Sequence, residues 1–394
     1  MTAAPSRTEF TYAVLGLGAI GSAAAYWLSR RAPGEVVALE QFDLGHTRGA
    51  SEDHSKIIRR SYHTPRYVEM TAHAYRAWEE VERASGERLV FRTGGLDLWP
   101  EHAAIPMSDY TESMSSCGVP FEELDAGAVM ERWPQWRLTD DVRAVFQPDA
   151  GLCAASRCNA AHRRLAVEHA ADLRDRSPVT AIEARDGEIE LTTPSGRITC
   201  GTLVLAADSW TNDVLGVLGV RPVPLTITKE QVVYFGTPDP ERFSPERFPI
   251  WIWMDDPSFY GFPAFGEPGP KAGQDVGGEP TTRAQLDDEP DAAALGRVRA
   301  FVEDHLPDAA GPILSLRTCT YTMPPDRDFV IDRLPERQNV ILLLGAAHGF
   351  KFASLFGSIA ADLATLGRSE HDLTHFRVDR EVLMMEEPPR SFLI

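Results

Sequence analysis

Lysine is scarce in this chain. Only four of its 39 basic residues are lysines, namely Lys56, Lys229, Lys271 and Lys351. All the other bases are arginines, so a surface that needs only positive charge is served by arginine. Each lysine is therefore a candidate for a specific role. The alternative is codon bias that has left four scattered remnants.

Net positive charge and long apolar segments are lacking as well. The 394 residues carry a formal charge of −19, which repels phosphate backbones and anionic lipid, so we expect no nucleic-acid or membrane partner. The longest apolar runs, such as 339–350, fall short of the roughly 20 residues that a membrane-spanning helix requires. The first ten residues, MTAAPSRTEF, contain no apolar segment of the kind found in secretory signals.

Cysteine is also rare. The five cysteines are irregularly spaced, which predicts neither a disulfide framework nor a zinc site, and no metal is expected. A reducing cytoplasm fits this composition best. With 43% hydrophobic and 25% charged residues, the chain has the composition of a globular protein, and its length predicts two domains.

The opening segment predicts a dinucleotide-binding unit. An apolar strand at 10–15 precedes the glycine-rich sequence GLGAIG at 16–21, a helical pattern at 22–31 and a second strand at 35–39 that ends in Glu40. The glycines permit a tight turn, close approach to a pyrophosphate and packing of helix on strand. The helix N-terminus offers N–H groups to phosphate, and an acid after the second strand can accept ribose hydroxyls. This pattern does not distinguish NAD from FAD.

The remaining pattern alternates between helix and strand. Helices are predicted at 67–84, 154–173, 291–306 and from about 354, and strands at 89–99, 179–192, 197–206, 223–235, 249–265, 313–321, 329–332 and 340–344. The segment 266–290 is rich in glycine, proline and acids, so we expect a long surface loop or flap there.

Four further stretches, together with GLGAIGSAAAYWL, carry a resemblance to a known family. They are SKIIRRSYHTPRYVEM at 55–70, FYGFPAFGEPGPKAG at 259–273, RTCTYTMPPDRDFVID at 317–332 and GAAHGFKFA at 345–353. In this order and spacing they resemble the monomeric sarcosine oxidases and N-methyltryptophan oxidases, within the D-amino-acid-oxidase-like flavoenzymes. The resemblance covers nearly the whole chain and implies FAD as the cofactor.

The resemblance also implies an architecture. The fold class is α/β, with a Rossmann-like FAD-binding domain interleaved with an antiparallel-sheet α+β substrate domain. The FAD-binding domain would comprise 1–87, 150–220 and 319–394. The substrate domain would comprise 88–149 and 221–318.

Several residues take their expected roles from this resemblance. Cys319 matches the cysteine that forms a covalent link to the flavin, and Arg317 close by is expected to lower the pKa of its thiol; the alternative is a small buried apolar side chain. Arg59 and Lys351 match the cations that hold the substrate carboxylate, a task suited to a bidentate guanidinium. Lys271 matches a lysine that promotes reaction with oxygen, where a fixed positive charge stabilises developing negative charge.

The complete expected site is larger. The residues assigned to the cofactor are Gly16, Gly18, Ala19, Ile20, Gly21, Glu40, Gln41, Ser55, Lys56, Val179, Trp210, Cys319, Ala347, Gly349, Phe350 and Lys351. Those assigned to catalysis are Lys271, His348, Arg59 and Lys351, and those assigned to substrate binding are Arg59, Lys351, Tyr260, Tyr321 and Trp251. For His348 and the two tyrosines, a structural role is an equal alternative.

The chain departs from the sarcosine oxidases at several of these positions. Lys56 replaces an arginine, Asp275 replaces a histidine, Ala347 replaces a glycine, and Trp251 and Trp253 stand where smaller residues line the pocket. These differences favour a bulkier or basic N-substituted amino acid over sarcosine itself.

The implied function is that of an FAD-dependent oxidase of a secondary amino acid, with an N-methyl or N-alkyl group. Hydride would pass from the C–N carbon to the flavin, and an imine and hydrogen peroxide would be the products. The expected partners are a small amine and O₂, and the expected state is a monomer. Alternatives are a fructosyl-amine oxidase, a cyclic imino-acid (pipecolate-like) oxidase and a flavin-dependent tailoring dehydrogenase. The paired cations disfavour a flavin-binding protein without catalytic activity.

Overall fold

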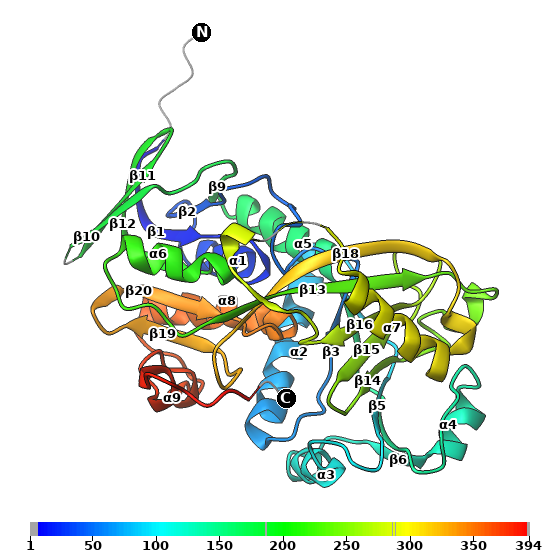
Figure 1. The fold of residues 1–394 in the computed structure, drawn as a ribbon. Helices are drawn as coiled ribbons and strands as arrows, with labels where there is room; N and C mark the ends of the chain where they lie inside the picture. The colour runs from blue at the N-terminus through cyan, green and yellow to red at the C-terminus, as the bar shows by residue number, and fades with distance from the viewer. Residues whose placement is uncertain (1–6, 186, 286, 288, 392–394) are drawn as a thin grey trace.

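The computed structural model describes residues 7–185, 187–285, 287 and 289–391, and it contains two large β-sheets (Figure 1). The first sheet contains β1 (Glu9–Leu15), β2 (Val36–Leu39), β9 (Asp172–Arg174), β10 (Ala181–Arg185), β11 (Glu188–Thr193), β12 (Gly196–Leu205), β19 (Val330–Leu334) and β20 (Arg337–Leu344). Strands β9, β2, β1, β12 and β20 lie parallel in this order. The hairpin β10–β11 and strand β19 add antiparallel edges.

Alternating side chains explain how this sheet is buried on both faces. In β2, Val36 and Ala38 pack toward one face, whereas Val37 and Leu39 pack toward the other. The first face is covered by α1 (Ala19–Arg31), α5 (Ala155–Glu168) and α8 (Ala353–Leu366), and the second by α6 (Thr211–Val217) and α9 (Glu381–Met384). Continuous apolar strands are typical of such doubly covered parallel sheets.

The second sheet forms the other half of the molecule (Figure 1). It contains β5 (Gly95–Trp99), β6 (Glu122–Asp125), β7 (Arg143–Gln147), β13 (Thr226–Phe235), β14 (Ile250–Trp253), β15 (Ser258–Phe262), β16 (Lys271–Asp275), β17 (Pro280–Thr281) and β18 (Ile313–Met323). All its pairings are antiparallel except that of β14 with β5. Helix α7 (Ala292–His305) packs on one face through Val298, Phe301 and Val302.

A small sheet of β3 (Ser55–Ile58), β8 (Gly151–Ala154) and β4 (Val90–Arg92) completes the described strands. The remaining α-helices are α2 (Pro65–Ser85), α3 (Met107–Ser116) and α4 (Ala126–Arg132). No helix within the described residues is both long and apolar enough to cross a membrane.

The predicted α/β fold class is confirmed, but two local predictions are wrong. The segment 266–290 is not simply a surface flap, because β16 lies inside the second sheet between β13 and β15. Two of its positions, 286 and 288, lie outside the described residues. The helix predicted at 154–173 ends earlier, at Glu168, and 172–174 forms the edge strand β9.

The strands follow the predicted domain ranges with two exceptions. Strand β4 falls in the range expected for the substrate domain, yet it pairs with β8 of the other range. Strand β18 spans 313–323 and so crosses the expected boundary at 318/319. The domain division itself stays a prediction.

The glycine-rich turn fixes how α1 begins beside the first sheet. Gly16 has a φ of +92°, a conformation that favours glycine, and a Cβ there would lie 2.5 Å from the carbonyl oxygen of Ala206. A Cβ on Gly21, inside α1, would lie 1.8 Å from the carbonyl oxygen of Gly16. The turn and the helix are therefore in backbone contact, and only glycine allows it.

We predict opposite effects for the same substitution in two helices. Gly21→Ala should destabilise the protein by about 2–3 kcal/mol, because the new methyl group meets backbone that cannot retreat. Gly296→Ala in α7, where nothing lies within 4 Å of the added Cβ, should stabilise it by about 0.5–1 kcal/mol. Denaturant unfolding of both variants measures the difference; equal effects would contradict the backbone contact at Gly21.

Candidate active site

Two adjoining cavities share part of their lining and form one groove. One cavity, of about 330 Å³, lies along the glycine-rich turn and the end of β2. The other, of about 220 Å³, is enclosed by β3, the second sheet and the segment 345–351. The residues that line both cavities are Gly18, Ala50, Ser51, Ala206 and Asp208. Because these residues are shared, the two cavities are continuous.

The cavity of about 330 Å³ has the features of a nucleotide site. The carboxylate of Glu40 accepts hydrogen bonds from the backbone N–H groups of Leu17 (2.9 Å) and Phe42 (3.1 Å). Burial raises the pKa of Glu40, but His46 and these N–H groups outweigh burial and hold the pKa below its ordinary value. An ionised acid is thus fixed beside the turn, where it can accept ribose hydroxyls.

The N-terminus of α1 faces the point where the cavities join. Gly18 precedes the helix and offers no side-chain cap, and the Ala19 N–H donates to the Ser51 hydroxyl at 2.9 Å. A Cβ on Gly18 would lie 2.8 Å from that hydroxyl. The backbone can therefore approach a pyrophosphate closely at the positive end of the helix. These residues fit FAD.

Most residues expected at the site line one of the two cavities. Those along the nucleotide part are Gly16, Gly18, Glu40, Gln41, Val179 and Trp210. Those in the other part are Gly18, Ala19, Ile20, Lys56, Arg59, Tyr260, Lys271, Tyr321, Ala347, His348, Gly349, Phe350 and Lys351. The expected residues that line neither cavity are Gly21, Ser55, Trp251 and Cys319.

The structure corrects the assignment of Trp251 to substrate binding. Alternation along β14 turns Trp251 away from the cavity and onto Phe301 of α7, with ring centroids 5.5 Å apart. Its neighbour Ile252 lines the cavity instead. Trp251 is a core residue, and Ile252 is its neighbour on β14 that lines the cavity.

Lys271 is a buried ammonium group at the start of β16. Its Nζ donates to the Asp53 carboxylate at 2.9 Å and to the Ser55 carbonyl at 2.6 Å, and it lies 3.9 Å from the ring centroid of Phe262. Burial lowers the pKa of Lys271 to about 8, although Asp53 opposes the shift. The charge is therefore fixed in place but close to neutralisation at mildly alkaline pH.

Asp53 is a site residue that the sequence does not identify. It is buried, and it accepts hydrogen bonds from Lys271, from the Tyr234 hydroxyl at 2.6 Å and from Arg317 at 3.4 Å. Burial raises the pKa of Asp53, but the ammonium groups of Lys271 and Lys56 outweigh it and hold the pKa well below its usual range. Asp53 is the counter-ion of the lysine.

Arg59 is already engaged by an acid. Its guanidinium lies 3.3 Å from the Asp97 carboxylate, and both side chains are buried. The Ser61 hydroxyl donates to the same Asp97 oxygen at 2.5 Å, and burial raises the pKa of Asp97 against the opposing effect of Arg59. The positive charge at Arg59 is thus partly offset by an acid on β5.

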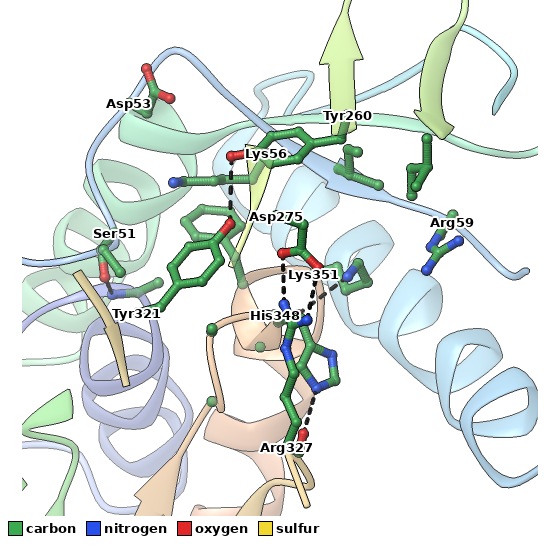
Figure 2. Close-up of a pocket in the computed structure, with 18 of the residues that line it drawn as sticks. Ser51, Asp53, Lys56, Arg59, Tyr260, Asp275, Tyr321, Arg327, His348 and Lys351 are labelled. Carbon is green, nitrogen blue, oxygen red and sulfur yellow. Dashed lines mark hydrogen bonds and ion pairs between the residues drawn. The ribbon is translucent and has the colours of Figure 1, made fainter. Parts of the chain in front are cut away.

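Lys351 and His348 come from the C-terminal part of the sequence and lie together in the cavity (Figure 2). Lys351 Nζ donates to the His348 carbonyl at 3.2 Å, and within the described residues it forms no ion pair with a carboxylate. His348 Nε2 lies 3.0 Å from the Arg327 carbonyl, which can only accept, so this nitrogen carries the proton. Burial, Lys351 and Arg327 lower the pKa of His348, which keeps the ring neutral.

A second guanidinium enters the cavity at Arg327. It is buried and forms a bidentate ion pair with Asp275, with both distances 2.7 Å (Figure 2). The hydroxyls of Tyr260 and Tyr321 face each other nearby at 3.5 Å. The acid that replaces the expected histidine is therefore neutralised within the cavity wall.

The expectation of a lowered thiol pKa at Cys319 is wrong. Burial raises the pKa of Cys319 to about 11, and Lys56 only opposes the shift. Arg317 is bound instead to Asp53 and to His54, the latter at 2.7 Å. Glu230, which pairs with Cys319 across β13 and β18, adds negative charge.

Sequence reasoning missed three acids and one arginine at the site, namely Asp53, Asp97, Asp208 and Arg327. A buried cation requires a counter-ion, so the expected Lys271 and Arg59 imply two acids near them. Which of the 58 acids these are cannot be read from local pattern. The sequence gives a partial signal for two of these residues, because Arg327 lies within the stretch 317–332 and Asp208 lies two residues before the expected Trp210.

A glycine-rich groove for a dinucleotide that continues into a cation-rich cavity defines a dinucleotide-dependent oxidoreductase. The chain belongs to the family described as FAD dependent oxidoreductase, whose model matches residues 11–363. It is 30% identical to the monomeric sarcosine oxidase of Bacillus sp. (strain NS-129), over 96% of this chain and 99% of the relative. The monomeric sarcosine oxidase of Streptomyces avermitilis is 35% identical over 92% and 95% of the two chains. The N-methyl-L-tryptophan oxidase of Salmonella heidelberg is 30% identical over 94% and 99%.

Solved structures share the fold. NikD, an unusual amino acid oxidase essential for nikkomycin biosynthesis, matches with a TM-score of 0.84 and 25% identity, over 94% of this chain and 98% of that chain. The L-proline dehydrogenase of P. horikoshii matches with a TM-score of 0.83 and 22% identity, over 94% and 97%. The chain is therefore an FAD-dependent oxidoreductase with the fold that NikD and this dehydrogenase share.

We predict that Asp53→Asn destabilises the protein by about 3–5 kcal/mol at pH 7, because it leaves the buried Lys271 ammonium without its counter-ion. Part of this loss should return as the pH rises. The pKa of Lys271 in the folded protein lies below its ordinary value, so the unfolded chain binds more protons above about pH 8 and stability rises with pH. In the variant this rise should begin at a lower pH, since Asp53 no longer opposes the shift.

Denaturant unfolding at pH 7 and pH 9 measures both effects. Asp379→Asn is the matched control, because it removes the acid of an exposed ion pair with Arg377 and should cost less than about 1 kcal/mol. A loss at Asp53→Asn no greater than that of the control would show that the buried pair does not stabilise the fold.

Proposed function

We propose that this protein oxidises the C–N bond of a secondary amino acid that carries an N-methyl or N-alkyl group, with O₂ as the electron acceptor. The single observation that carries the proposal is the convergence of Lys351, Lys271 and His348 on one cavity that continues into the FAD groove. The sarcosine and N-methyltryptophan oxidases that resemble the chain support the substrate class.

Lys351 is the group we assign to the substrate carboxylate. Its ammonium is buried, has hydrogen-bonding capacity beyond the His348 carbonyl and forms no ion pair with a described carboxylate. Arg59 adds positive potential that Asp97 partly offsets. Anchoring the carboxylate orients the reacting C–H bond and can supply several kcal/mol of the barrier. The same cations and the burial favour the neutral amine, which is the form that can release hydride.

FAD, when bound, supplies the hydride acceptor and the path of electrons to oxygen. Lys271 provides a fixed positive charge where oxygen becomes negative, and Asp53 with the Ser55 carbonyl holds that ammonium in place. Neutral His348, with its proton on Nε2, is available as a polar wall beside the amine. Tyr260, Tyr321 and Ile252 enclose the substrate and exclude water.

We further propose a covalent link between FAD and Cys319, and a monomeric state. The partly exposed thiol lies near Lys56 and Lys271, whose charges favour the thiolate that must attack an electron-poor ring. The monomer rests on the relatives that are called monomeric sarcosine oxidases. The cytoplasmic location stays a prediction.

The substrate class is tested by hydrogen peroxide release from a panel of amines. We expect N-methyl amino acids to be oxidised with a higher kcat/KM than the corresponding primary amino acids. Faster oxidation of pipecolate or of fructosyl amino acids would replace the proposal with one of those two activities. If an N-methyl amino acid reduces the bound flavin but no hydrogen peroxide forms when air is admitted, a dehydrogenase would be favoured.

Lys351→Met tests the carboxylate site with the same panel. Loss of one charge-assisted hydrogen bond should lower kcat/KM by roughly 10- to 100-fold, mainly through KM. Lys229→Met is the matched control, because Lys229 pairs with the exposed Asp287 at 2.6 Å and lines neither cavity, and its kcat/KM should stay within about twofold. Equal effects of the two variants would remove Lys351 from the site.

The covalent link is tested by acid precipitation. The yellow colour should stay with the precipitated wild-type protein and should pass to the supernatant for Cys319→Ser, because serine cannot form the thioether. Colour in the wild-type supernatant would refute the link and leave FAD bound without it.

A further inference from the structure

The region where the two cavities meet contains an acid, Asp208, to which neither the fold nor the resemblance gives a role. Asp208 lines both cavities and follows the end of β12, at the start of the short helix η1 (Asp208–Trp210). Its φ is +45°, a left-handed conformation that is uncommon for any residue except glycine and concentrates at functional sites. The chain thus places a carboxyl group where FAD must pass.

One oxygen of the Asp208 carboxyl lacks a hydrogen bond of good geometry, although the Thr322 hydroxyl and the Ser209 backbone act on the group. Its Oδ2 is buried and has no hydrogen-bond partner among the described residues. Most buried polar atoms are paired, so an orphaned oxygen in a ligand groove indicates a partner that the ligand supplies. Burial raises the pKa of Asp208 to about 6.

Two cations and one hydroxyl, from three other elements, act on Asp208. Lys56 lies on β3, Arg283 lies on η3 (Arg283–Gln285), and both favour the ionised carboxylate, as does the Thr322 hydroxyl of β18. Arg283 is itself held over the Trp210 ring at 3.5 Å and near Asp213. The two cations lower the pKa of Asp208 less than burial raises it, so the carboxyl takes up a proton more readily than an exposed aspartate does.

The ligand group that meets this acid is set by the turn beside it. Gly18, like Asp208, lies where the two cavities meet. The N-terminus of α1 directs its N–H groups to this region, so the pyrophosphate is expected there. Phosphate oxygens only accept hydrogen bonds and carry negative charge. An ionised carboxylate would repel them, whereas a protonated one can donate to them.

We propose that Asp208 is a ligand of the FAD pyrophosphate, that its protonated carboxyl donates a hydrogen bond to a phosphate oxygen, and that FAD binding is therefore coupled to proton uptake. The proton comes from solvent and remains on the carboxyl while FAD is bound. The proposal requires only FAD, so it stands or falls independently of the amine substrate.

The sign of the pH dependence follows from this coupling. Below about pH 6 the free protein already carries the proton, so the Kd for FAD should be nearly constant. Above pH 6 each molecule of FAD must recruit a proton, and the Kd should rise by up to about 50-fold between pH 6 and pH 8. At pH 7 close to one proton, about 0.9, should be taken up for each FAD bound.

FAD binding to the full-length Cys319→Ala protein, stripped of cofactor, tests the proposal whether or not the natural link forms. Flavin fluorescence titrations from pH 5.5 to pH 8.5 give the Kd with Asp208 and with Asp208→Asn, whose amide donates the same bond but cannot ionise. We expect the variant to lose the rise in Kd above pH 6. Asp379→Asn, which removes an acid that lines neither cavity, should keep it.

Three results would overturn the proposal. The first is an unchanged pH dependence in Asp208→Asn. The second is an affinity that increases with pH, because an ionised Asp208 would then accept from a ribityl hydroxyl. The third is the absence of proton uptake when the Cys319→Ala protein, which retains Asp208, binds FAD at pH 7. Calorimetry in buffers of different ionisation enthalpy measures this uptake and does not need the Asp208 variant to fold.

Discussion

The buried ion pair between Lys271 and Asp53 joins the two halves of this molecule. Asp53 lies in the segment that leads from the nucleotide groove to β3, and Lys271 lies on β16 of the second sheet, 218 residues later. Removing two charges from water is costly, and the pair is tolerable because Ser55, Tyr234 and Arg317 complete its hydrogen bonds. The position of the second sheet relative to the FAD groove is therefore tied to the geometry of a single ammonium group.

The same arrangement recurs around the cavity and determines its charge. Arg59 is paired with Asp97 and Arg327 with Asp275, and each pair joins segments that are far apart in the chain. Three cations are thus offset by three acids, and the cavity is less positive than its list of bases indicates. Lys351 differs, because no described carboxylate pairs with it. An anionic substrate group gains most where positive charge is not already compensated, so the cavity is selective in where it binds a carboxylate.

The sequence predicts features that depend on local order and fails where long-range packing decides. The turn at 16–21 and Glu40 are predictable because strand, glycines, helix and acid follow one another within one unit. The cavity wall at β14 is not, since IWIW is apolar on both faces and alternation alone cannot tell whether Trp251 or Ile252 faces the ligand. The strand β16 escapes prediction because glycine and proline surround it, and its pairing with β13 and β15 is a tertiary effect. Counter-ions such as Asp97 have no local signature.

The scarcity of lysine can now be separated from chance residue by residue. Lys229 pairs with an exposed acid at the surface, a position where arginine would serve equally well, so codon bias is a sufficient account of it. Lys271 is different, because its Nζ is surrounded by one carboxylate, one carbonyl and the Phe262 ring. A guanidinium would bring five donors to two acceptors and could not lose its charge. An ammonium fits this space, and its pKa of about 8 brings the loss of its charge into the mildly alkaline range. The position therefore favours the smaller cation, which the acceptors around it can satisfy.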